Sequence, residues 1–219
     1  MQDASVIIRS LNRGDRRDVA EICYRTGYHG EDLSGSGRFN DRKLFAMIFA
    51  EYYVRWEPGH CFVAVDTTSG RAVGYILGAL DTIRQERGFS RRMVPRIACR
   101  ALFHTFWRHR ESFRALLHFN RVDRNKPSLG AIHRAYPAHL HINVLPEYRR
   151  RGLGGLLLES FERHARREGA VGVHLITSER NTTALPFYGK HGYRVATAVL
   201  PGLWPDSPAV RGLVFVRSL

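Results

Sequence analysis

The segment YRRRGLGG, at Tyr148 to Gly155, constrains the fold of this 219-residue chain more than any other. It follows an apolar strand pattern, HLHINVLP, and precedes an amphipathic helix pattern, LLLESFERHARRE. Glycines let a backbone approach a ligand closely, and the unpaired N–H groups at a helix start attract an anion. The segment therefore predicts a strand, a turn and a helix that together cradle a phosphate group.

Two well-known phosphate loops have other spacings. A P-loop has the pattern G-x-x-x-x-G-K-[ST], and a dinucleotide-binding loop has the pattern G-x-G-x-x-G. Here Gly152, Gly154 and Gly155 follow three arginines. The segment fits neither loop.

A second informative segment, NTTALPFYGKHGYRV, follows the strand-like run VGVHLIT. Asn181 predicts a helix N-cap, and Gly192 predicts the left-handed residue that ends a helix after Lys190 and His191. The chain is therefore expected to repeat a strand and a helix after the phosphate turn.

The two segments resemble the two signatures of the GNAT superfamily of N-acetyltransferases. Arg149, Gly152 and Gly154 match the Arg/Gln-x-x-Gly-x-Gly/Ala turn, whose amides hold the pyrophosphate of acetyl-CoA in that family. The second signature is matched at Asn181, Ala184, Phe187, Tyr188, Lys190, Gly192 and Tyr193. The resemblance implies that acetyl-CoA is held by Asn143, Val144, Arg149, Arg150, Arg151, Gly152, Leu153, Gly154, Gly155, Asn181, Phe187, Tyr188 and Lys190.

The remaining patterns indicate an α/β fold. Strands are expected at Ser5 to Leu11 and in a hairpin at Cys61 to Leu80, with helices at Arg13 to Thr26 and Asp41 to Arg55. The order β-α-α-β-β, insertion, β-α-β-α-β-β predicts a mixed central sheet flanked by helices, which is the GNAT architecture. One domain, residues 1–219, is the simplest organisation, with a helical insertion at about residues 82–127 before the active-site strand. The glycine-rich Gly27 to Gly37 predicts a flexible loop.

A closer resemblance concerns the runs EPGHCFVAVD, VGYILGALDT and YPAHLHINVLPEYRRRGLGGLLL. They are similar to the acetyltransferase-like domain attached to eukaryotic O-GlcNAcases and to its stand-alone bacterial relatives. The similarity extends from about Glu57 onward. Some members of that group have lost the acetyl-CoA loop, which this chain keeps.

The family resemblance also implies catalytic groups. A backbone N–H of the strand before the phosphate turn polarises the thioester carbonyl, which points to an amide near Asn143 or Val144. A tyrosine at the position of Tyr188 protonates the departing thiolate.

The general base is the least determined group. His139, His141 and Asn143 share one face of the strand, and an imidazole can accept a proton near neutral pH. The relatives tend to carry Asp where this chain has Asn143, and an amide cannot act as a base. His141 and Asp81, at the end of the preceding strand, are the remaining candidates.

The charge of the chain is strongly basic and unevenly placed. The formal net charge is +14, and the segment from Thr82 to Lys126 holds twelve Arg and Lys against three Asp and Glu, a net charge of +9. Its apolar residues have roughly helical spacing: Ile97, Ala101, Phe103, Trp107, Phe113, Leu116 and Leu117. A solvated basic face, an acidic acceptor, an anionic membrane surface and nucleic acid all fit this composition.

The cysteines and the N-terminus bear on location. Cys23, Cys61 and Cys99 are odd in number and lack metal-ligand spacing, which favours a reducing compartment and predicts no metal site. Neither a signal peptide nor an apolar run long enough for a membrane span is seen. We expect a cytoplasmic protein, and a homodimer is compatible with its composition.

Three functions remain open from the sequence. The first is an acetyl-CoA-dependent N-acetyltransferase acting on an amine of a small molecule or protein, with an acidic acceptor favoured by the basic insertion. The second is a binding module that keeps the cofactor site without the chemistry. The third is a nucleic-acid or membrane-surface binder built on the insertion.

Overall fold

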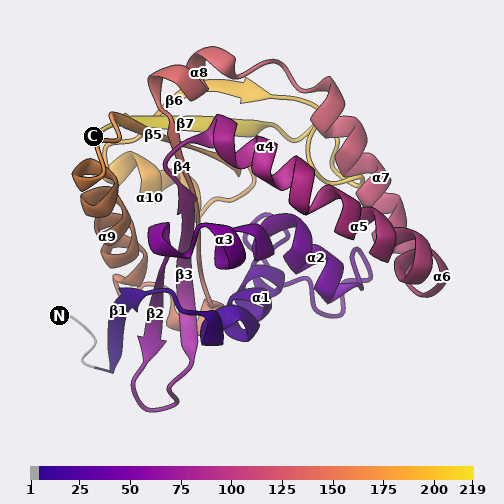
Figure 1. The fold of residues 1–219 in the computed structure, drawn as a ribbon, viewed down its shortest axis with the longest axis horizontal. Helices are drawn as coiled ribbons and strands as arrows, with labels where there is room; N and C mark the ends of the chain where they lie inside the picture. Colours follow the sequence, from indigo (N-terminus) through magenta and orange to yellow (C-terminus); the bar gives the residue numbers. More distant parts are fainter. Residues whose placement is uncertain (1–4) are drawn as a thin grey trace.

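The computed structural model describes residues 5–219, in which seven strands form one mixed sheet (Figure 1). The strands, in the order β1-β2-β3-β4-β5-β7-β6, are β1 (Val6–Ser10), β2 (Phe62–Asp66), β3 (Ala72–Ala79), β4 (Ala138–Val144), β5 (Gly172–Ser178), β7 (Gly212–Ser218) and β6 (Arg194–Val199). All neighbours pair antiparallel except β4 and β5, which are parallel. The predicted mixed sheet flanked by helices is confirmed.

Helices cover both faces of the sheet. They are α1 (Arg16–Arg25), α2 (Arg42–Phe49), α3 (Glu51–Trp56), α4 (Thr82–Arg92), α5 (Val94–Arg100), α6 (Phe106–Arg108), α7 (Arg110–Asn125), α8 (Gly130–Ala135), α9 (Leu153–Arg167) and α10 (Ala184–Lys190). Helix α9 packs on one face of β1 to β4, and α1 and α3 pack on the other. The intervening β3 is buried at every residue, as its apolar run VGYILGA predicts for a strand covered on both faces.

Two predicted helices have different boundaries. The helix expected at Asp41 to Arg55 is divided into α2 and α3, because Ala50 leaves the helical region at φ −132° and ψ −40°. The helix after the phosphate turn begins at Leu153 rather than Leu156, because Gly152 takes the N-cap position with φ +80°. Gly154 and Gly155 therefore belong to the first helical turn.

The basic insertion forms a helical hairpin between β3 and β4. Helices α4, α5 and α6 run in succession away from the sheet, and α7 returns toward it (Figure 1). The predicted apolar stripe is correct at Ile97 and Ala101, which are buried, and α5 packs against α2. It is wrong at the tip, where Phe103 is 80% exposed and Trp107 is 73% exposed, because the hairpin extends beyond the body of the protein. Within residues 5–219, no helix is both long and apolar enough to cross a membrane.

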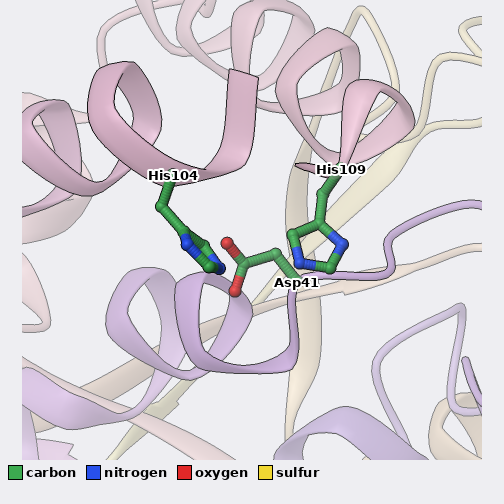
Figure 2. Close-up of side chains that lie close together, drawn as sticks. All are labelled: Asp41, His104 and His109. Atoms are coloured by element: carbon green, nitrogen blue, oxygen red, sulfur yellow. The ribbon is translucent and has the colours of Figure 1, made fainter. Parts of the chain in front are cut away.

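A buried carboxylate joins the insertion to α2. Asp41 caps α2 through the N–H of Leu44 at 3.0 Å, and it also accepts from the Arg100 guanidinium at 2.7 Å and the Thr105 hydroxyl at 2.6 Å. His104 and His109 approach the same carboxylate from the hairpin (Figure 2). Both carboxylate oxygens already accept these donors, so a divalent cation would have to displace a paired guanidinium. The cluster therefore serves to connect the insertion to α2.

Candidate active site

The strands β4 and β5 separate where the predicted phosphate turn begins. They pair only at Ala138 with Val173 and at His139 with His174. Beyond that point β4 pairs only with β3, so one edge of its backbone has no strand partner. The N–H of Leu145 bonds to the Val73 carbonyl of β3 at 2.9 Å. Because strand amides alternate in direction, the Val144 N–H points into the gap between β4 and β5.

A cavity of about 430 Å³ opens at this gap and extends to the turn before α9. Nearly all of the residues predicted to hold acetyl-CoA line it: Asn143, Val144, Arg149, Arg150, Gly152, Leu153, Gly154, Gly155, Asn181, Phe187, Tyr188 and Lys190. Arg151 is the exception, and it lines a neighbouring groove along α9. We refer to the 430 Å³ cavity as the cofactor cleft.

The turn presents backbone N–H groups to the cofactor cleft. Leu153, Gly154 and Gly155 are the first residues of α9, so their amides have no carbonyl partner within the helix. The positive end of the helix dipole adds to their attraction for an anion. A Cβ at Gly154 would lie 3.2 Å from the Phe187 ring, so a larger residue there would narrow the cleft. The residues present thus fit a pyrophosphate-bearing ligand.

The three arginines of the turn differ in their hydrogen bonds and backbone conformation. Arg149 donates to the carbonyl oxygens of Val144 at 3.1 Å and Gly30 at 2.6 Å, and burial lowers its pKa. Arg150 has the left-handed φ of +62°, and Arg151 donates to the Glu147 carbonyl at 3.0 Å. Arg149 therefore ties the turn to the end of β4.

Tyr188 lies on α10 at the wall of the cofactor cleft. Its side chain is 5% exposed and packs between the rings of Tyr193, at 5.7 Å, and Phe215, at 5.4 Å. Its hydroxyl makes no hydrogen bond within residues 5–219, and burial raises its pKa. The phenol therefore keeps its proton and faces the cleft. Gly192 follows the end of α10 with φ +79°, as predicted. The predicted N-cap is two residues off, because Thr183 holds that position, although the Asn181 side chain accepts the N–H of Ala184.

A chain of hydrogen bonds on the polar face of β4 fixes the protonation of two histidines. The Thr82 hydroxyl donates to the Pro137 carbonyl at 2.8 Å, because a carbonyl only accepts. Its oxygen then accepts from Nδ1 of His139 at 2.8 Å, and burial holds the pKa of His139 well below its usual value. Nε2 of this neutral ring accepts from the Tyr53 hydroxyl at 2.7 Å. Tyr53 has given its one proton, so its oxygen accepts from Nε2 of His141 at 3.2 Å.

This chain leaves Nδ1 of His141 as an unprotonated nitrogen. Among the described residues Nδ1 has no hydrogen-bond partner, and the ring is exposed to a second cavity beside the cofactor cleft. Burial, and to a lesser degree His174, lowers the pKa of His141 to about 4. Water in the cavity opposes that shift, but the ring is neutral at physiological pH in either case. Its position suits a proton acceptor.

The second cavity, of about 380 Å³, meets the cofactor cleft at Gly30, Asn143 and Asn181. Nδ2 of Asn143 donates to the Tyr75 hydroxyl at 2.7 Å. The far walls are the rings and aliphatic side chains of α2, α7, β5 and the segment before β7, including Phe45, Phe49, Phe119, Val122, Ile176, Leu203 and Trp204. We call this cavity the acceptor cavity.

Two expectations about acceptor-side residues are not met. Asp81 is exposed, caps α4 by accepting the N–H of Arg84 at 3.0 Å, and lines neither cavity. It follows the end of β3 that lies beside His139, away from Asn143. Of the twelve basic residues in the insertion, Lys126 alone lines the acceptor cavity, and Arg92 and Arg96 stack on Trp56 instead. The insertion does form a wall of the cavity, with Phe119, Val122 and Asp123 of α7 and with Lys126 after it.

Sequence reasoning missed several residues of the site. Tyr53 sits in an apolar helix pattern with nothing to mark its hydroxyl as a partner of β4. Phe119 and Trp204 are far from the family signatures in the chain. Gly30 lies in the loop expected to be flexible, whose Tyr28 and His29 hydrogen-bond to Asp206 and Ser207. No local signal in the sequence identifies these contacts.

Comparison with known proteins agrees with this geometry. The sequence model of the acetyltransferase (GNAT) family matches residues 31–193. The crystal structure of SsHAT is 35% identical over 98% of both chains, with a TM-score of 0.78. The uncharacterized N-acetyltransferase YjcF of Bacillus subtilis (strain 168) is 44% identical over 54 residues, which are 25% of this chain and 36% of that protein.

A more distant structure shows likeness in fold alone. Ard1 from Thermoplasma volcanium is 18% identical over 99% of both chains, with a TM-score of 0.58. The family match, in contrast, spans both signatures, the separated strands and the cofactor cleft between them. The chain belongs to the acetyltransferase (GNAT) family.

Proposed function

We propose that the protein is an acetyl-CoA-dependent N-acetyltransferase. One observation carries the proposal: the cofactor cleft and the acceptor cavity meet at Asn143, with the Tyr188 phenol on one side and Nδ1 of His141 on the other. Acetyl-CoA, when bound, supplies the acetyl group as a thioester. The residues of the chain bind it, orient it and handle the protons.

Each residue has a role that follows from its contacts. The amides of Leu153, Gly154 and Gly155 would hold the pyrophosphate of acetyl-CoA, and the Val144 N–H would donate to its thioester carbonyl oxygen. The Tyr188 hydroxyl would supply the proton that the sulfur needs on leaving. His141 takes the proton of the attacking amine at Nδ1, directly or through one water.

The lowered pKa of His141 limits its strength as a base. A lowered pKa leaves the ring unprotonated and able to accept a proton at neutral pH, but it also makes the ring a weaker base. Asn143, whose amide cannot act as a base, orients the amine through its carbonyl oxygen.

The competing proposal is a module that binds acetyl-CoA without transferring its acetyl group. It is favoured by Asn143, at the position where related proteins tend to carry Asp. The two are separated by measuring acetyl-CoA binding by calorimetry and CoA release with a panel of amines. Binding with release from at least one amine supports the enzyme, and binding without release from any amine supports the module.

Three finer features belong to the same proposal. Kinship with the stand-alone relatives of the O-GlcNAcase-attached domain is supported by the end-to-end match to the SsHAT chain. A cytoplasmic location is supported by the free thiols of Cys23, Cys61 and Cys99. In a homodimer, the exposed apolar tip of the hairpin, with Phe103 and Trp107, would lie in the interface. Sedimentation over a range of protein concentrations tests whether the protein dimerises.

A further inference from the structure

The walls of the acceptor cavity carry four aromatic rings that pack against one another. Phe45 and Phe49 of α2 lie 4.6 Å apart between ring centroids, and Phe119 of α7 lies 5.4 Å from Trp204, edge to face. Phe45 also stacks on Trp204 at 6.2 Å. Phe45, Phe119 and Trp204 are each less than 8% exposed, so packing holds these rings in fixed positions within the cavity wall.

Aliphatic side chains continue this surface. Ile176 is 46% exposed, because β4 has turned away from β5 at this point. Leu203 is 40% exposed, and Val122 of α7 is partly exposed. All three line the acceptor cavity. An apolar ligand would remove this surface from water, which favours its binding.

The charges on the cavity wall are already paired. Lys126 and Asp123 form an ion pair at 2.7 Å, and Arg211 is paired with Glu179 at 2.8 Å. The cavity thus has neither a cluster of free cations for an acidic acceptor nor an unpaired carboxylate for a second ammonium group. Burial lowers the pKa of His29, which keeps that ring neutral as well.

The size of the cavity favours a small molecule. Its volume of about 380 Å³ falls within the ~300–1,000 Å³ typical of small-molecule sites. Asn143 lies at the junction with the cofactor cleft, and His141 lines the acceptor cavity two residues earlier on the same face of β4, so the amine group of an acceptor would lie at that end. The rest of the acceptor then extends toward Phe119 and Trp204.

We propose that the acceptor is a small primary amine carried on an apolar body, a class that the arylalkylamines represent. This inference rests on the proposed acetyltransferase function and names the substrate class of the same site. The amine nitrogen would form a bond to the acetyl carbon as the carbon–sulfur bond of the thioester breaks. The sulfur would leave as the thiol of CoA with the proton of Tyr188, and the amine proton would pass to Nδ1 of His141. The apolar wall selects the body of the acceptor.

The first test is a competition of amine classes. Tryptamine and phenethylamine are compared with spermidine and with an acidic peptide bearing a free N-terminal amine, each with saturating acetyl-CoA and release of CoA as the readout. The expected kcat/KM is at least about tenfold higher for the arylalkylamines than for the other two. A preference for spermidine or for the acidic peptide would overturn the proposal.

The second test uses a matched pair of variants on one helix. Val122→Arg places a cation in the acceptor cavity, and Leu117→Arg places one on the exposed side of α7, where Leu117 is 54% exposed and lines neither cavity. We expect Val122→Arg to raise the KM for tryptamine at least about tenfold without changing acetyl-CoA affinity, and Leu117→Arg to change neither. Equal effects of the two variants would contradict a role for the cavity wall.

The acceptor class can still be tested if the protein binds acetyl-CoA without transferring its acetyl group. If acetyl-CoA binds but no amine releases CoA, binding of tryptamine to the acetyl-CoA complex is measured by calorimetry in the wild type and in both variants. Binding that Val122→Arg abolishes and Leu117→Arg preserves supports the apolar acceptor class without catalysis. No tryptamine binding to the wild type overturns the proposed class.

Discussion

The cofactor cleft and the acceptor cavity meet at Asn143, yet they are built in different ways. Most of the cofactor cleft comes from two short stretches of chain, the end of β4 with the start of α9, and helix α10. The acceptor cavity gathers side chains from α1, α2, β3, α7, β4, β5 and the segment before β7. The cleft that we propose for the cofactor is thus built from local motifs, whereas the cavity that we propose for the acceptor depends on how distant elements pack.

The largest effect that we expect concerns Tyr188, on the cofactor side. Tyr188→Phe removes a hydroxyl that makes no hydrogen bond to the described part of the chain and leaves the packed ring in place. Turnover should fall by roughly two to four orders of magnitude, the scale of a general acid, with little change in acetyl-CoA affinity. Steady-state kinetics and calorimetry measure the two quantities. Parallel loss of affinity and turnover would show that Tyr188 acts only in packing.

The difference between the two regions also explains what the sequence predicts. The residues that line the cofactor cleft follow from the patterns at Arg149 to Gly155 and at Asn181 to Gly192, because the turn and the helix ends are set by neighbouring glycines and caps. Asp81 was expected near the chemistry because β3 precedes the active-site strand, but the antiparallel register puts its end beside His139.

The acceptor wall and the histidine chain required the structure. Trp204 meets Phe45 and Phe119 only after α2, α7 and the segment before β7 have packed together. The helix is interrupted at Ala50, so α3 is a separate helix, and its Tyr53 contacts His139 and His141 of β4. Neither arrangement follows from helix or strand periodicity, which reports which face is apolar but not which partner it meets.

A second variant tests whether the cofactor cleft can be closed without disturbing the acceptor cavity. Gly154→Val directs a branched side chain at Phe187, where even a Cβ lies 3.2 Å from the ring. Acetyl-CoA affinity should fall at least about tenfold, or ~1.4 kcal/mol, as measured by calorimetry. Gly59→Val is the control, because a Cβ there meets nothing within 4 Å and Gly59 lines neither cavity. Unchanged affinity in Gly154→Val would contradict the placement of the pyrophosphate.

Breaking the hydrogen-bond chain on β4 should lower the rate of reaction with the amine and leave acetyl-CoA affinity unchanged. Tyr53→Phe removes the oxygen that accepts from Nε2 of His141, so Nδ1 is no longer held as the unprotonated nitrogen. We expect kcat/KM for the amine to fall about tenfold, part of the usual contribution of a general base, with acetyl-CoA affinity unchanged. Tyr52→Phe, one residue earlier in α3, provides the control. A change in acetyl-CoA affinity in Tyr53→Phe would mean that the chain supports the fold of both regions instead.

The smallest effect concerns stability in acid, to which His174 of β5, whose ring lies 5.8 Å from that of His139, should contribute. Burial lowers the pKa of His174 to about 4, against the ordinary value of 6.5 in the unfolded chain. The unfolded state therefore binds more protons between pH 6.5 and 4, so the stabilisation is complete above pH 6.5 and is lost as the pH falls toward 4. Because of this one buried neutral histidine, the free energy of unfolding should fall by about 1 kcal/mol as the pH is lowered from 7 to 5.5. Urea unfolding at these two pH values measures the loss, and His174→Gln should reduce it by about that amount. An identical loss in the variant would assign the acid sensitivity to other groups, with His139 the next to replace.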